Sequence, residues 1–231
     1  MKNREKKELL LGSISIIAFL VWTALIQIVD VQPIGQNETD IGFSSFNSWF
    51  HNWTGVHMGL YILTDWLSVI PLFICMLFGG IGLVQFVKRR SLWKVDYDII
   101  FLGIYYVAVI FSYLIFERIP INYRPILIEG VMEVSYPSST TLLVLSVMPT
   151  LSFQINQRVK NENMKKMIGI LTNMFSMFMV IGRLVSGVHW FTDIVGSVML
   201  SFGFFSIYKI NSFIILVILV ITSVEDAVKQ V

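Results

Sequence analysis

Charged residues are scarce in this sequence, and cysteine is almost absent. Asp, Glu, Lys and Arg make up only 14% of the 231 residues, whereas a soluble domain carries about a quarter. With a mean hydropathy of +0.74, this composition excludes a soluble globular protein. The single cysteine, Cys75, falls within an apolar run, which excludes a disulfide framework and a cysteine metal site. The chain is therefore expected to lie in a membrane.

Long apolar runs, by contrast, are abundant. A spanning helix needs about 20 mostly apolar residues, and the sequence predicts an all-α fold, a bundle of six transmembrane helices in a single domain over residues 1–231. The first run is interpreted as an uncleaved span and not as a signal peptide, because no small-residue cleavage pattern follows it. A shorter run at 213–222 either prolongs the sixth helix or lies at the membrane surface. The six expected spans lie near residues 9–30, 58–87, 97–116, 139–157, 167–185 and 190–208.

The basic residues predict an orientation. Of the 17 Lys and Arg residues, all but three lie in the N-terminal tail, the 88–94 and 158–166 loops, or after the sixth span. Loops rich in Lys and Arg stay in the cytoplasm, so we expect both termini in the cytoplasm. The aromatic-rich segment 31–57 then lies outside, as a loop or short helix at the headgroup level. Topology accounts for these charges, and no nucleic-acid partner is expected. The three exceptions, at the outer ends of helices, are Arg118, Arg124 and Arg183.

The stretch GRLVSGVHWFTD, residues 182–193, brings three of the rare ionisable groups together. His189 and Asp193 are four residues apart, which predicts one helix face and a separation of about one turn. A carboxylate there can hold one imidazole nitrogen and leave the other free to act. Arg183 precedes the turn expected at residues 186–187. Ionisable groups at membrane depth are costly and usually mark function, so this stretch is a candidate site.

A second polar stretch, PSST at residues 137–140, precedes an apolar run. Ser138 is predicted to be a helix N-cap, which leaves the next amide groups unpaired at the outer face. Such a helix N-terminus binds anions, and the guanidinium fork of Arg124 matches phosphate. Topology places this stretch, Arg124 and the 182–193 stretch at the same membrane face. Together they predict a phosphate site.

These motifs resemble those of the type 2 phosphatidic acid phosphatase superfamily. The pattern Arg183-x5-His189-x3-Asp193 resembles the last motif of that superfamily, PSST resembles its Pro-Ser-Gly-His motif, and Tyr123-Arg124-Pro125 resembles the end of its Lys-x6-Arg-Pro motif. The resemblance covers about residues 97–208. It implies hydrolysis of a lipid phosphate at the outer membrane face.

The resemblance also implies residue roles. His189 attacks phosphorus and forms a phosphohistidine, and Asp193 orients it. No metal and no cofactor is needed, because phosphoryl transfer depends mainly on positioning and charge stabilisation. The phosphoryl oxygens are bound by Arg124, Arg183 and Ser138, with Ser139 and Thr140 at the same helix N-terminus.

Two positions depart from the pattern of the superfamily. Its lysine is Glu117 here, although the neighbouring Arg118 could reach the same phosphate, and its second histidine is Thr140. Threonine cannot protonate a leaving group, and general acid catalysis contributes roughly 10²–10⁴ in rate. A diphosphate needs this help least, because its leaving group is a phosphate monoester. We therefore expect a polyprenyl diphosphate such as undecaprenyl diphosphate as the substrate.

Several alternatives stay open at the level of sequence. A proton donor from the outer segments is one alternative, and Asp65 is an intramembrane charge without an assigned role. The protein is a phosphotransferase if His189 passes its phosphoryl group to an acceptor other than water. It is a silent lipid-phosphate binding or transport protein if the two lost motif residues abolish catalysis. The sequence gives neither the lipid tail nor the oligomeric state. Candidate replacement donors are His51, His57, Glu129 and Glu133.

Overall fold

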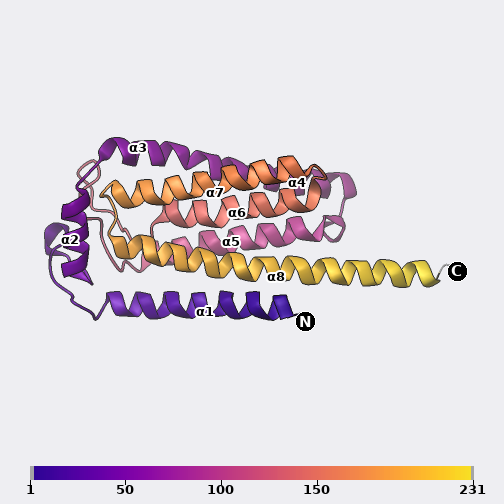
Figure 1. Ribbon diagram of the computed structural model, residues 1–231, viewed down its shortest axis with the longest axis horizontal. Coiled ribbons are helices and arrows are strands. Elements are labelled where there is room, and N and C mark those ends of the chain that lie inside the picture. Colours follow the sequence, from indigo (N-terminus) through magenta and orange to yellow (C-terminus); the bar gives the residue numbers. More distant parts are fainter. Residues whose placement is uncertain (1–2, 230–231) are drawn as a thin grey trace.

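A computed structural model describes residues 3–229 of the chain, and its regular structure is helical. Figure 1 shows the long helices side by side in one bundle, with the short helix α2 across one end. Two short 3₁₀ turns, η1 and η2, lie in the loops at residues 36–38 and 92–94. The helices are α1 Asn3–Ile26, α2 Ser44–Thr54, α3 Met58–Leu67, α4 Val69–Arg89, α5 Tyr97–Arg118, α6 Ser139–Arg158, α7 Glu162–Val185 and α8 Phe191–Lys229.

The expected number of six spans is not confirmed. Within the described residues, five helical segments are long and apolar enough to cross a membrane: 5–26, 58–89, 97–118, 162–185 and 191–210. The second segment is the pair α3 and α4, which meet end to end at Ser68. The expected span at 139–157 forms α6, a helix of 20 residues, but its hydropathy is too low for it to count among the five.

Helix α6 has low hydropathy because other helices enclose it. It packs against α4, α5, α7 and α8, and two of its buried polar side chains bond to side chains on α5 and α8. The Tyr106 hydroxyl of α5 bonds the Thr150 hydroxyl at 2.8 Å, and the Gln154 amide donates to the Tyr208 hydroxyl of α8 at 2.8 Å. Polar groups satisfied inside a bundle are compatible with a membrane protein. Long apolar runs therefore mark helices that face lipid, and α6 is largely enclosed by other helices.

Helix α8 continues through the short apolar run at 213–222. It extends from Phe191 to Lys229, which decides between the two alternatives in favour of a prolonged sixth helix. Figure 1 shows the C-terminal half of α8 projecting past the ends of the other helices, while α1 packs along its N-terminal half.

The two ends of the bundle differ in composition. At one end lie α2, the 119–138 loop and the connection between α7 and α8, whereas the basic loops between α4 and α5 and between α6 and α7 lie at the other (Figure 1). Helix α2 exposes the aromatic side chains Trp49 and Trp53, as expected for a short helix at the headgroup level. The motif residues gather at the α2 end.

Candidate phosphate site

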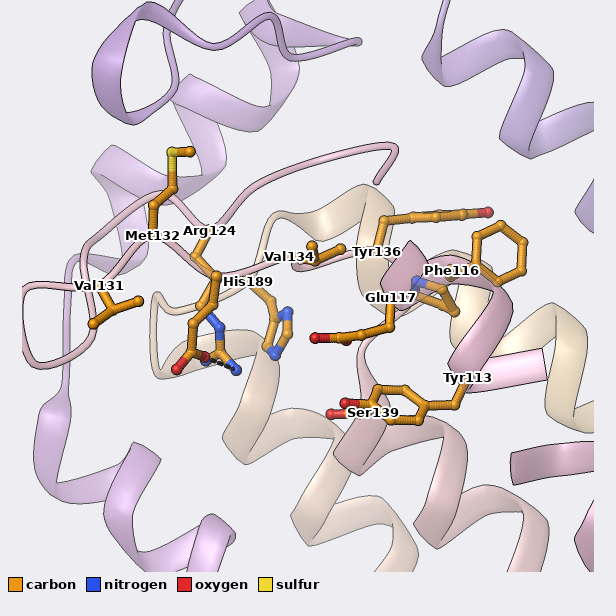
Figure 2. A pocket seen from close by; sticks show the side chains of 12 residues that line it. Tyr113, Phe116, Glu117, Arg124, Val131, Met132, Val134, Tyr136, Ser139 and His189 are labelled. Carbon is orange, nitrogen blue, oxygen red and sulfur yellow. Dashed lines mark ion pairs between the residues drawn. The ribbon is translucent and has the colours of Figure 1, made fainter. Parts of the chain in front are cut away.

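A cavity of about 420 Å³ opens at the α2 end of the bundle. Its walls come from the end of α5, the 119–138 loop, the start of α6 and the connection before α8. Of the predicted site residues, Arg124, Ser139 and His189 line it, together with the carboxylates Glu117 and Glu133. Figure 2 shows the imidazole of His189 between Arg124 on one side and Ser139 and Glu117 on the other. The remaining walls are apolar or aromatic.

The 119–138 loop is a short hairpin-like segment that presents Arg124. Backbone pairing joins residue 123 with 134 and residue 128 with 131. The turn between the latter pair is Glu129-Gly130, where both residues have positive φ, as a tight type I′ turn requires. The Arg124 amide donates to the carbonyl of Glu133 at 3.0 Å, so the two residues lie opposite each other. Local pairing therefore fixes the base of the arginine side chain.

The guanidinium of Arg124 is nearly enclosed and only partly bonded. Its Nη2 forms an ion pair with Glu133 Oε2 at 3.0 Å. Its Nε and Nη1 are buried and have no hydrogen-bond partner among residues 3–229. Buried donors without partners are costly, so this guanidinium is suited to an anion that supplies the missing acceptors.

The start of α6 has the predicted cap. Ser138 Oγ accepts a hydrogen bond from the amide of Thr141 at 3.5 Å, which confirms the N-cap prediction. Ser139 lines the cavity, but the Thr140 side chain turns to Arg183, whose Nη2 donates to Thr140 Oγ1 at 2.7 Å. At position 140, where the superfamily motif has a histidine, this chain has a hydroxyl that accepts a hydrogen bond from Arg183.

Arg183 is buried beside Thr140, with 1% of its surface exposed. Besides Thr140 it contacts α3, where Asp65 Oδ1 lies 3.5 Å from Nη2, and Thr64 Oγ1 lies 3.5 Å from Nη1. Its Nε is a further buried donor without a partner in the described part of the chain. Asp65, which had no predicted role, is therefore a neighbour of this arginine.

The connection between α7 and α8 contains the expected turn. Gly187 has φ +73°, and a Cβ atom on it would stand 2.2 Å from the carbonyl oxygen of Gly55. A larger residue would be strained by the backbone angle and would also clash. His189 follows two residues later, ahead of the start of α8 at Phe191. The prediction that His189 and Asp193 share a helix face is therefore wrong, because His189 precedes the helix.

The imidazole of His189 has one bonded and one free nitrogen. Nδ1 lies 3.1 Å from the carbonyl oxygen of Ser135, which can only accept, so Nδ1 carries the proton. Nε2 is buried without a hydrogen-bond partner in residues 3–229. Burial, assisted by the nearby Arg124 and Arg183, lowers the pKa of His189 to about 4, although Asp193 opposes the shift. At neutral pH the free nitrogen therefore keeps its lone pair.

Asp193 supports this arrangement from the first turn of α8. Its Oδ2 lies 3.6 Å from Nδ1 of His189 and accepts the amide of Trp190 at 2.9 Å. Its Oδ1 accepts from the side-chain amide of Asn122 at 3.0 Å. Neither Asn122 nor the Ser135 carbonyl was among the residues predicted from the sequence. Asn122 stands two residues before Arg124, within the first motif, and this position was the available signal.

The other candidates lie outside the cavity walls. Arg118 ends α5 as an exposed side chain, and Glu129 occupies the exposed tip of the hairpin. The ring nitrogen Nε2 of His51 is bonded to the carbonyl of Gly187, and that of His57 to the carbonyl of Thr54. Over residues 3–229, no three His, Cys, Asp or Glu side chains come together as a metal site would require.

Comparison with known proteins confirms the resemblance drawn from the motifs. Residues 116–216 match the family model of the PAP2 superfamily, and this stretch contains Arg124, Arg183, His189 and Asp193. Over these residues the chain is similar to this superfamily of membrane phosphatases.

One similar solved structure is that of a transmembrane PAP2-type phosphatidylglycerolphosphate phosphatase from Bacillus subtilis. It is 18% identical to this chain, with a TM-score of 0.61, and the match covers 86% of this chain and 94% of the other. At this identity the likeness establishes the fold. No curated protein sequence matches the chain.

Proposed function

We propose that the protein hydrolyses a lipid phosphate in the 420 Å³ cavity, with Nε2 of His189 as the nucleophile. The observation that carries this proposal is the state of that nitrogen. It is buried, lacks a partner in the described part of the chain, and keeps its lone pair because Nδ1 donates to the Ser135 carbonyl. An imidazole fixed in this tautomer can attack a phosphorus atom without first losing a proton.

The proposed reaction has two steps. Nε2 forms a bond to phosphorus while the bond from phosphorus to the leaving oxygen breaks, and water then cleaves the phosphohistidine to release inorganic phosphate. The donors for the phosphoryl oxygens are the unpartnered Nε and Nη1 of Arg124 and Nε of Arg183, with the first amides of α6. Charge stabilisation of this kind accounts for most of the catalysis in phosphoryl transfer.

A polyprenyl diphosphate is the proposed substrate. Thr140 is engaged with Arg183 and cannot donate a proton to the leaving group, which favours a phosphate monoester as the leaving group over a basic alkoxide. The aromatic and apolar walls contributed by Phe116, Val134 and Tyr136 provide a surface for the start of a lipid chain.

The test is phosphate release by detergent-purified protein from a matched lipid monophosphate and diphosphate, with a chelator present. The expected products of the diphosphate are inorganic phosphate and the lipid monophosphate. Transfer of the phosphoryl group from the lipid to an acceptor other than water would identify a phosphotransferase. Absence of both phosphate release and acid-labile phosphohistidine would identify a silent binding protein and overturn the proposal.

The acid side of the pH profile provides a second measurement. Because the pKa of His189 lies near 4, below its ordinary 6.5, the neutral nucleophile persists as the pH falls from 7 to 5. The phosphate of the free lipid also titrates, near pH 6, and this contributes an inflection to kcat/KM. The quantity to measure is therefore kcat at saturating lipid, which reports the enzyme–substrate complex. We expect kcat to decline only as the pH falls through about 4, and a decline centred near 6.5 would contradict the free and buried Nε2.

The proposed orientation places the cavity outside the bacterial cell and both termini in the cytoplasm, with α6 as a sixth crossing. In a Cys75→Ser background, Ser91→Cys is expected to resist a membrane-impermeant thiol reagent in intact cells. Leu127→Cys, in the loop beside the cavity, is expected to react. Labelling of position 91 from outside would reverse the topology derived from the basic loops.

A further inference from the structure

Helix α3 brings one aromatic ring against two guanidinium groups of the site. The Cζ atom of Arg183 lies 4.8 Å from the ring centroid of Tyr61, and that of Arg124 lies 5.7 Å from the same centroid. Both distances are within the range of cation–π attraction. Tyr61 is thus shared between the two arginines, which come from different segments of the chain.

The same face of α3 supplies further contacts to Arg183. Thr64 and Asp65 follow Tyr61 by three and four residues, so all three side chains share one side of the helix. Thr64 Oγ1 and the Tyr61 carbonyl each lie 3.5 Å from Nη1 of Arg183, and Asp65 Oδ1 lies 3.5 Å from its Nη2. Helix α3 lies outside residues 116–216, which match the superfamily.

A shared ring helps to hold two cations close together. Two guanidinium groups in a buried environment repel each other, and negative charge beside them offsets this repulsion. Glu133 supplies such charge to Arg124 and Asp65 to Arg183, and the ring of Tyr61 contacts both arginines at once. The face of an aromatic ring carries negative charge density. An arginine held against such a ring keeps its unpartnered donors, Nε and Nη1 of Arg124 and Nε of Arg183, available to a phosphoryl group.

We propose that Tyr61 is a positioning residue that holds Arg124 and Arg183 together in the geometry for the phosphoryl group. This inference rests on the proposed phosphatase function. Tyr61 acts through the arginines and not on the substrate, since its ring face lies against their guanidinium groups. Its loss should therefore weaken the binding of the transition state more than that of the lipid.

The test compares Tyr61→Leu, which removes the ring, with Tyr61→Phe, which keeps it. The readouts are kcat, KM and the inhibition constant of orthovanadate, an analogue of the phosphoryl transition state. For Tyr61→Leu we expect weaker vanadate inhibition and lower kcat, each by about tenfold, the effect of losing the cation–π attraction between one ring and the two guanidinium groups. KM should change little, and Tyr61→Phe should restore most of the loss. Trp66→Leu, on the lipid-facing side of the same helix and 74% exposed, is the matched control.

Each outcome decides between the alternatives. A folded Tyr61→Leu protein with the vanadate inhibition of the unmodified protein overturns the inference. A lower melting temperature with unchanged vanadate inhibition assigns Tyr61 a structural role only and also overturns it. Where the leucine variant does not fold, Tyr61→Met, closer in length and likewise without a ring, is measured against the same two criteria. Failure of the unmodified protein to release phosphate would instead refute the proposed function.

Discussion

Replacing His189 with alanine is expected to abolish turnover, with a loss on the order of 10⁴ or more, as when a covalent nucleophile is removed from other enzymes. The reason is that the free Nε2 has no substitute in the cavity: the other nitrogen donors lining it belong to Arg124, which cannot lose its proton. The measurement is phosphate release together with trapping of labelled phosphohistidine after acid-free quenching. Both signals should disappear.

The control for this variant is His57→Ala. His57 lies at the same end of the bundle but is exposed, with Nε2 bonded to the Thr54 carbonyl, so its loss should leave turnover near that of the unmodified protein. Full activity of His189→Ala would end the phosphohistidine proposal.

Asp193→Asn is expected to have a smaller effect, mainly on kcat. Where a carboxylate alone fixes the imidazole tautomer, the corresponding change costs about 10⁴. Here the Ser135 carbonyl accepts the Nδ1 proton at 3.1 Å, while Asp193 is 3.6 Å away. The tautomer should survive, and we expect a loss of about 10² with substrate binding largely intact.

The second large effect is expected for substrate preference and for Thr140→His. In the unmodified protein, a lipid diphosphate should turn over faster than the matching monophosphate by roughly the 10²–10⁴ contributed by a general acid. An imidazole at position 140 should accelerate the monophosphate preferentially, because only an alkoxide leaving group needs the proton. The measurement is kcat/KM for both lipids in both proteins.

Thr140→Val is the matched control for this experiment. It removes the hydroxyl that accepts from Arg183 Nη2 at 2.7 Å without supplying a proton donor. Both lipids should therefore slow down, with their ratio unchanged. This control separates the loss of the arginine contact, which Thr140→His shares, from the gain of an acid.

Equal rates on the two lipids, with no change of ratio in Thr140→His, would mean that another proton donor serves the leaving group. That donor is then expected among the residues that line the cavity. Glu117 and Glu133 line the cavity, whereas His57 does not within the described residues. Glu133 is already paired with Arg124, so Glu117→Gln becomes the first variant to examine.

Apolar runs in the sequence located the helices that face lipid. They predicted α1, the pair α3 and α4 as one span, α5, α7 and the first part of α8, because lipid contact requires apolar side chains along the whole helix. They did not show the break at Ser68, where α3 and α4 meet. The sixth expected span is α6, whose enclosed and more polar sequence has too low a hydropathy to count among the five, so the number six stays a proposal.

The site residues that belong to motifs could be predicted from the sequence. The groups that contact those residues from other parts of the fold could not. Arg124, Ser139 and His189 line one cavity as expected. The Ser135 carbonyl is a backbone group, so no residue type reveals it. The ring of Tyr61 reaches the arginines only because α3 packs against α7, and a tyrosine in an apolar helix carries no signal of such a contact.

The ion pair between Arg124 and Glu133 has a consequence for the end of each catalytic cycle. Its carboxylate, 3.0 Å from Nη2 and 41% exposed at the side chain, offers Arg124 an acceptor whenever the phosphoryl group is gone. Departure of inorganic phosphate then does not leave this cation wholly unpartnered, and the carboxylate competes with the returning anion. The same competition applies to the phosphate group of the substrate, so in the proposed enzyme the Arg124–Glu133 pair weakens the binding of the lipid headgroup and of free phosphate alike.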